Sequence, residues 1–209
     1  MPDSTYEEQK LIEFLERLSS REPIPGGGAA VAIVSSFTFA LGAMVASLSQ
    51  GERFQEVKEK MKGIEEDLKA KMYSFLRLAQ EDELAFQELR ETLRLPRGET
   101  LRSDRLLAAA KKAVNVPLEL VNNLSSFYPV FKFLLEKGNR NLLSDTGIAC
   151  LFAASAIQAS VLNALINLTW VTDKEFCRET LSKVEKASQC ALDFQALAQV
   201  VRNSLEGGQ

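Results

Sequence analysis

The sequence predicts an all-α protein, a single bundle of long antiparallel helices. Apolar residues recur at spacings of three and four over most of the chain, which is the helical period. No segment alternates polar and apolar residues as a strand does. Two long uncharged stretches, 24–50 and 146–172, have the composition of buried helices. With 209 residues, 46% of them hydrophobic, the chain can bury one substantial core, so we expect one domain over 1–209.

The amino-terminal region predicts a short helix followed by a turn. Apolar residues at helical spacing indicate an amphipathic helix over 6–19, with candidate caps at Asp3, Ser4 and Thr5. Residues 21–28 then hold two prolines in alternate positions and three consecutive glycines. The prolines favour an extended approach, and the glycines permit a backbone that other residues avoid. An uncharged, buried helix is expected over 29–50.

The middle of the chain predicts long amphipathic helices separated by loops. Residues 52–93 combine many charges with apolar residues at helical spacing, with an interruption expected near Gly63. A loop is expected over 95–100. Residues 101–136 again indicate helix, with Pro117 and Pro129 as kinks or breaks. Gly138 is expected to end this segment.

The last two helices are expected from Ser144 or Asp145 to about residue 171, and over 173–205. Within the first of them, small and amide residues recur along one stripe: Ala149, Ala153, Ala156, Ser160, Asn163 and Asn167. Small residues let another backbone approach closely. A buried amide without partners costs about 1–3 kcal/mol, so Asn163 and Asn167 indicate polar contacts with another helix, a second subunit or a ligand.

The uncharged stretches are long enough to span a bilayer. They also contain many polar residues and lack an aromatic belt or flanking lysine clusters, which favours helices buried in protein. A chain of this size can bury two helices on all sides most easily when these helices also pack against the same helices of a second subunit. We therefore expect a homodimer formed through the buried apolar helices, with no membrane contact.

Composition excludes several other classes. The net charge is −3 and the basic residues are dispersed, unlike a nucleic-acid-binding surface. The three cysteines predict free thiols in a reducing compartment, and the polar amino terminus does not resemble a signal peptide, so a cytoplasmic location is expected. The chain has no histidine, so any catalysis here relies on carboxylates, lysines, hydroxyls, amides and helix ends.

Four segments, in order over nearly the whole chain, resemble the formimidoyltetrahydrofolate cyclodeaminase family. The two main segments are Pro23-Ile-Pro-Gly-Gly-Gly-Ala-Ala-Val-Ala32 and Lys137-Gly-Asn-Arg-Asn-Leu-Leu-Ser-Asp-Thr-Gly147. The supporting segments are Glu81-Asp-Glu-Leu-Ala-Phe86 and Ala113-Val-Asn-Val-Pro-Leu118. The family also includes methenyltetrahydrofolate cyclohydrolases. This chain departs from its pattern at Ala29, where serine is usual, and at Leu142, where serine also is usual.

The resemblance implies a lyase of one-carbon metabolism and histidine degradation that binds a reduced folate, with or without a polyglutamate tail. It implies no metal and no cofactor beyond this substrate. The implied reaction cyclises 5-formimidoyltetrahydrofolate to 5,10-methenyltetrahydrofolate and releases ammonia. One alternative is methenyltetrahydrofolate cyclohydrolase activity. Another, from a different class, is a non-catalytic helical scaffold or interaction protein.

The implied reaction needs a base near N10 and an acid for the leaving nitrogen. Asp82 is the first candidate, although a solvated charge within the acidic run 81–83 is the alternative. Asp145 is the second, together with Ser144; ordinary helix capping is the alternative for both.

The resemblance also implies a set of substrate-binding residues, each with an ordinary structural alternative. These are Gly26, Gly27, Gly28, Lys137, Asn139, Asn141, Ser144 and Asn163. The glycines expose backbone at a helix start, and the asparagines can bind the pterin edge. Lys137, and with it Arg140, Lys111 and Lys112, are candidates for the anionic glutamate tail.

Overall fold

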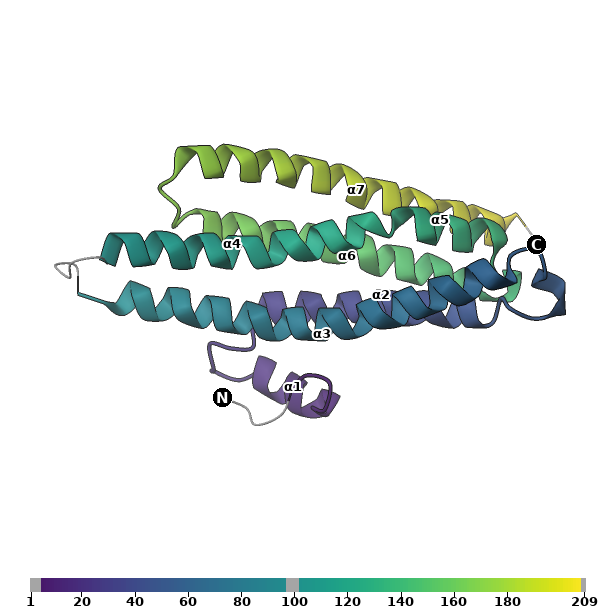
Figure 1. Ribbon diagram of the computed structural model, residues 1–209, viewed down its shortest axis with the longest axis horizontal. Helices are drawn as coiled ribbons and strands as arrows, with labels where there is room; N and C mark the ends of the chain where they lie inside the picture. Colours follow the sequence, from purple (N-terminus) through teal and green to yellow (C-terminus); the bar gives the residue numbers. More distant parts are fainter. Residues whose placement is uncertain (1–4, 97–101, 208–209) are drawn as a thin grey trace.

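The computed structural model describes residues 5–96 and 102–207, and all regular structure in these ranges is helical, as predicted. Seven α-helices and two 3-10 turns follow one another along the described chain (Figure 1). They are α1 (Leu11–Leu18), α2 (Gly27–Ser47), η1 (Glu52–Phe54), α3 (Lys58–Arg94), α4 (Arg102–Ser126), α5 (Tyr128–Lys137), η2 (Arg140–Leu142), α6 (Leu143–Leu168) and α7 (Lys174–Glu206).

The long helices form an antiparallel bundle in which α4 and α5 follow one another along the same direction (Figure 1). Helix α2 packs between α3 and α6, α4 contacts both α3 and α6, and α7 packs along α6. The short α1 lies outside the bundle, below α2 and α3 in the view of Figure 1. Helices α2 and α6 are antiparallel, so the start of α6 lies near the end of α2, at the opposite end of α2 from its glycine turn.

Two helix starts differ from the sequence prediction. Helix α1 begins only at Leu11, because residues 6–9 form a turn in which the Thr5 carbonyl accepts the amides of Glu8 and Gln9. The prediction that Thr5 caps this helix is therefore wrong, and the candidates Asp3 and Ser4 lie outside the described residues. Helix α3 begins at Lys58, after η1, and it continues without interruption through Gly63.

The start of α6 also corrects a prediction. The helix begins at Leu143, directly after η2, with Leu142 at the cap position and no side-chain cap. Ser144 and Asp145 therefore lie inside its first turn and do not cap it. Their backbone groups belong to the helix because the η2 turn leads the chain directly into it, with the Leu143 amide bonded to the Arg140 carbonyl.

Prolines act as expected at one of the two positions. Pro129 lies at the first turn of α5, where α4 ends and a new helix begins, so it marks a break. Pro117 is accommodated inside α4. Gly138 ends α5 as predicted, but with an extended backbone, φ −75° and ψ 174°, not the left-handed conformation common at this position.

Two apolar clusters form the core. The larger joins all seven helices, with Leu120, Val121 and Leu124 as its part of α4, and the smaller joins α3, the earlier part of α4 and α6 near the α3–α4 connection. On α3 the larger cluster ends at Ala79 and the smaller begins at Ala85. On α6 the larger cluster ends at Val161 and the smaller begins at Ala164. Asp82 and Asn163 occupy these boundaries, so polar side chains interrupt the core where the two clusters meet.

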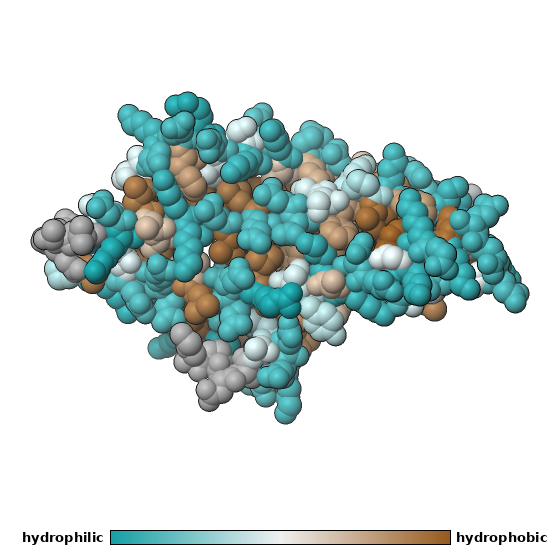
Figure 2. All heavy atoms as spheres, in the orientation of Figure 1, coloured by the Kyte–Doolittle hydropathy of each residue, from teal (hydrophilic) through white to brown (hydrophobic). Residues whose placement is uncertain are grey.

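The uncharged helices α2 and α6 are only partly covered, and the prediction that each is buried on all sides is wrong within one chain. Leu162 and Ile166 of α6 are 69% and 62% exposed. Both helices are long and apolar enough to cross a membrane by length and composition, a property shared by core helices of soluble proteins. The face drawn in Figure 2 is largely hydrophilic, with hydrophobic residues visible in the furrows between helices.

Candidate functional site

A small polar cavity of about 140 Å³ lies at the amino-terminal end of α2. Four helices and the proline-glycine turn contribute to its wall, so its residues come from distant parts of the sequence. The lining residues are Pro23, Ile24, Gly26, Gly27, Gly28, Asp82, Phe86, Ala113, Asn163, Ile166 and Asn167. We refer to this cavity as the Asp82 pocket. The pocket unites one predicted catalytic residue with four predicted substrate-binding residues.

The carboxylate of Asp82 packs directly against the backbone of Gly28. A Cβ atom at position 28 would collide with the carboxylate carbon and both its oxygens, so only glycine fits this contact. The Ala29 amide interacts with the same carboxylate and lowers its pKa. Asp82 therefore sits at the start of α2, where unpaired helix amides favour negative charge.

Burial, and after it the neighbouring Glu83 carboxylate, nevertheless raise the pKa of Asp82 to about 6, against the lowering effect of the Ala29 amide. A carboxyl group with this pKa is both an effective acceptor and an effective donor near neutral pH. The pocket can thus support proton transfer between two atoms of a bound molecule.

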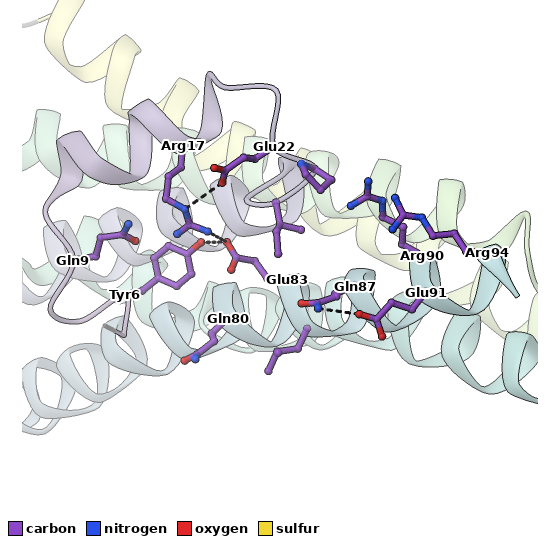
Figure 3. A pocket seen from close by; sticks show the side chains of 13 residues that line it. Tyr6, Gln9, Arg17, Glu22, Gln80, Glu83, Gln87, Arg90, Glu91 and Arg94 are labelled. Carbon is purple, nitrogen blue, oxygen red and sulfur yellow. Dashed lines mark hydrogen bonds and ion pairs between the residues drawn. The ribbon is translucent and has the colours of Figure 1, made fainter. Parts of the chain in front are cut away.

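Glu83 was missed as a functional candidate, and the structure gives it a defined environment. Its side chain is only 5% exposed; it accepts the Tyr6 hydroxyl and lies 3.6 Å from a guanidinium nitrogen of Arg17 (Figure 3). Burial and Glu83 together raise the pKa of Tyr6, so its hydroxyl stays protonated. The acidic run 81–83 and an arginine in the first helix were the only sequence signals for this contact.

A larger cavity of about 540 Å³ adjoins the Asp82 pocket, and both are lined by Pro23 and Ile24. Its remaining wall comes from the amino-terminal segment and one face of α3 (Figure 3). We call it the Arg17 cavity. A volume of this size accommodates a ligand of drug-like dimensions, whereas the Asp82 pocket by itself accommodates only a reacting group.

The two asparagines of the α6 stripe have different environments. The Asn167 amide donates to the Ala113 carbonyl at 2.8 Å and so ties α6 to α4. The Asn163 side-chain oxygen lies on the pocket wall facing Gly27. Since the Asn163 side chain has no hydrogen bond to any residue that the structure describes, its amide is available to a ligand in the pocket.

Comparison with known proteins identifies the family. Residues 10–186 match the model of the formiminotransferase-cyclodeaminase family, which is most of the chain. The chain belongs to this family. It is similar to the methenyltetrahydrofolate cyclohydrolase of Methylorubrum extorquens, with 30% identity over 82% of this chain and 85% of that protein. It is also similar to mouse formimidoyltransferase-cyclodeaminase, with 29% identity over 98% of this chain but only 38% of the mouse protein.

The fold agrees with a solved family member. The crystal structure of formiminotetrahydrofolate cyclodeaminase from Thermotoga maritima superposes with a TM-score of 0.84, at 29% identity, over 96% of this chain and 98% of that one. The all-α bundle is therefore the family fold. Relatives of this chain carry the names of two different reactions, both on one-carbon-substituted tetrahydrofolates.

The second family segment, Lys137 to Gly147, does not reach the Asp82 pocket within one chain. The Asn139 side-chain amide donates to the Leu48 carbonyl at 3.2 Å, at the far end of α2. Since α2 runs from Gly27 to Ser47, this contact lies about 30 Å from the glycine turn. These residues therefore do not line the Asp82 pocket of their own chain, and their binding or catalytic roles stay predictions: Lys137, Asn139, Asn141, Ser144 and Asp145.

Several of these polar side chains have structural contacts instead. The Asn139 backbone amide donates to Ser49 Oγ at 2.8 Å, and its side-chain oxygen accepts the Asn141 amide, so Asn139 fixes the η2 turn to α2.

The two lysine candidates on α4 have ion pairs within the chain. Lys111 pairs with Asp173 and Lys112 with Glu88, each at 2.6 Å. Within residues 5–96 and 102–207, no three acidic or thiol side chains are grouped to hold a metal ion, and the metal-free site stays a prediction.

The Asp82 environment makes a prediction about pH in this family member. If Asp82 must be ionised to accept a proton, kcat/KM should fall below about pH 6. Glu83→Gln removes the nearby negative charge that raises this pKa, so the acidic limb should move to lower pH. Glu81→Gln, at an exposed neighbour, should leave it unchanged. If the fall of kcat/KM at low pH occurs at the same pH or at a higher pH in Glu83→Gln, the assignment of this pH dependence to Asp82 is contradicted.

The same pKa has a consequence for stability. The folded pKa lies above the ordinary value of 3.8, so the folded chain binds this proton more tightly than the unfolded chain. The contribution of Asp82 to stability therefore decreases as pH rises from about 4 to about 6, and the cost of the buried charge persists above that.

Proposed function

We propose that this protein is a folate enzyme that converts 5-formimidoyltetrahydrofolate to 5,10-methenyltetrahydrofolate and releases ammonia, with Asp82 as its acid–base group. The single observation that carries the proposal is the buried Asp82 carboxyl group, pKa about 6, at the start of α2 in a pocket with Asn163. Membership of the formiminotransferase-cyclodeaminase family supports the substrate class.

The proposed reaction requires two proton transfers at neighbouring nitrogens. N10 attacks the carbon of the formimidoyl group, which is protonated on its nitrogen, and forms a tetrahedral intermediate. The Asp82 carboxylate takes the N10 proton and then donates it to the amino group, which leaves as ammonia when its bond to carbon breaks. The product is the methenyl cation, and the Asp82 carboxylate that remains next to it stabilises its positive charge.

The small volume of the pocket suits this role. The one-carbon bridge would occupy the Asp82 pocket, and the Asn163 amide would bind a polar edge of the pterin. The rest of the substrate extends into the adjoining Arg17 cavity. Burial excludes water from the cyclisation and maintains the raised pKa of Asp82.

A second candidate is methenyltetrahydrofolate cyclohydrolase activity, the name carried by the Methylorubrum extorquens relative. In that reaction the Asp82 carboxylate would activate a water molecule for attack on the methenyl carbon. The two candidate reactions act on the same one-carbon unit and differ in the small molecule involved. The cyclodeaminase releases ammonia from this carbon, whereas the cyclohydrolase adds water to it.

Parallel assays on the purified protein separate these functions. Formation of methenyltetrahydrofolate absorbance with stoichiometric ammonia, from 5-formimidoyltetrahydrofolate, supports the cyclodeaminase. Loss of that absorbance when methenyltetrahydrofolate is the substrate, faster than without enzyme, supports the cyclohydrolase. Absence of both activities, together with no calorimetric binding of a reduced folate, would reject both and leave the helical scaffold.

We further propose that the protein is a cytoplasmic homodimer formed through α6 and α2. Four exposed apolar residues of α6 lie on one face, at successive spacings of three, eleven and four, which is about three helical turns for the middle interval: Ile148, Leu151, Leu162 and Ile166. A two-fold axis across the middle of α6, near Ser155, would place Asp145 of the partner subunit opposite Ile166. The second family segment would then complete the Asp82 pocket of its neighbour.

This arrangement predicts that assembly and activity are lost together. Leu162→Glu places a charge on the proposed interface, and it should convert a dimer of two 23.2 kDa chains to monomers with little activity. Light scattering after size exclusion measures the mass. Leu192→Glu, at an exposed leucine of α7, should change neither property. A monomeric wild-type protein that is fully active would reject the dimer and the shared site.

A further inference from the structure

The Arg17 cavity carries an unassigned feature at the end that lies away from Tyr6. One face of α3 lines the cavity with residues three and four apart: Gln80, Glu83, Leu84, Gln87, Arg90, Glu91 and Arg94. At its carboxyl-terminal end this face presents two arginines separated by one helical turn. Figure 3 shows their guanidinium groups projecting from α3 in the same direction, beyond Gln87 and Glu91.

Neither arginine has an ion pair or side-chain hydrogen bond with any residue that the structure describes. Arg17, the third arginine of the cavity, has carboxylates nearby, although its Nη1 atom is buried without a hydrogen bond to any described residue. Arg17 lies near both Glu83 and Glu22, and Glu91 accepts a hydrogen bond from Gln87 at 2.9 Å. The cavity wall thus holds three arginines and three glutamates, and the two guanidinium groups without an ion pair to a described residue lie together at one end, where Glu91 is their neighbour in sequence.

We propose that Arg90 and Arg94 form an anion subsite that binds the carboxylates of the substrate's glutamate tail. This inference rests on the proposed folate substrate and adds the residues that hold its tail. Guanidinium groups bind carboxylates in bidentate geometry, and two of them one turn apart fit a chain that carries several carboxylates.

The position of the pair along α3 fits this assignment. Asp82 and Arg90 are eight residues apart and Asp82 and Arg94 twelve, which correspond to about 12 Å and 18 Å along the helix axis. The reacting end of the substrate at Asp82 and its anionic end at the arginines would thus occupy two neighbouring cavities that share Pro23 and Ile24 in their walls.

The test compares the same substrate with one and with several γ-linked glutamates. In the wild-type protein kcat/KM should be higher for the longer tail, and the difference should shrink as salt increases. The double variant Arg90→Gln/Arg94→Gln should reduce the ratio of the two kcat/KM values about tenfold, through KM. The matched control Lys58→Gln/Lys62→Gln removes two exposed charges one turn apart on the same helix, and it should leave the ratio unchanged.

A probe without the pterin separates failure of this inference from failure of the proposed function. Calorimetry with p-aminobenzoyl-tri-γ-glutamate should show binding to the wild-type and control proteins and none to Arg90→Gln/Arg94→Gln. Probe binding without turnover of any folate would reject the proposed function and keep the anion subsite. Turnover with no effect of tail length, or an unchanged ratio in the arginine variant, would overturn the subsite and leave both arginines as favourable charges at a helix carboxyl end.

Discussion

Asp82→Asn should reduce kcat by about 10²- to 10⁴-fold, because the amide can neither take up the N10 proton nor return it to the leaving amine. Asparagine has nearly the same size and can still contact the Ala29 amide, so the fold should be unchanged. The variant should also unfold at a higher temperature than the wild type at pH 7.5, since it removes a buried charge. Steady-state kinetics and thermal unfolding measure the two effects.

The opposite signs of these effects make the test specific. A residue with a purely structural role would lose stability and activity together. Glu81→Gln, at the exposed position next to Asp82, serves as the control and should alter neither property by more than a small factor. Turnover by Asp82→Asn within a few fold of wild type would show that another group transfers the protons.

Gly28→Ala should reduce kcat/KM by about 100-fold, because the new Cβ occupies the position of the Asp82 carboxylate and forces it to move. A shift of about 1 Å at a catalytic group is enough for a loss of this size. Crowding at this contact should also lower the free energy of unfolding by about 1–3 kcal/mol. Kinetics and denaturant unfolding test both expectations.

Gly63→Ala provides the matched comparison. Position 63 lies within α3 and no atom lies within 4 Å of an added Cβ, so alanine should stabilise the helix by about 0.5–1 kcal/mol and leave activity intact. Equal activity of Gly28→Ala and wild type would mean that the tight contact between Gly28 and Asp82 is not needed for the reaction.

Helical spacing and composition were sufficient to predict most of the fold. The uncharged stretch after the glycines became α2, and the charged amphipathic segment became the continuous α3. The break at Pro129 followed from local backbone chemistry. The capping predictions failed at Thr5, Ser144 and Asp145, because a preceding turn can start a helix without a side-chain cap.

The sequence indicated Asn163 because an amide interrupts a stripe of small residues, and it indicated Asp82 and the three glycines through the family resemblance. It could not indicate that Glu83 is buried against Tyr6 and Arg17, because that contact joins segments some 66 to 77 residues apart. Only the packing of α2, α3 and α6 decided which polar residues share a cavity. It brought Asp82 to the Gly28 backbone and left Lys137 to Asp145 at the far end of α2, because α2 and α6 run antiparallel and the start of one lies beside the end of the other.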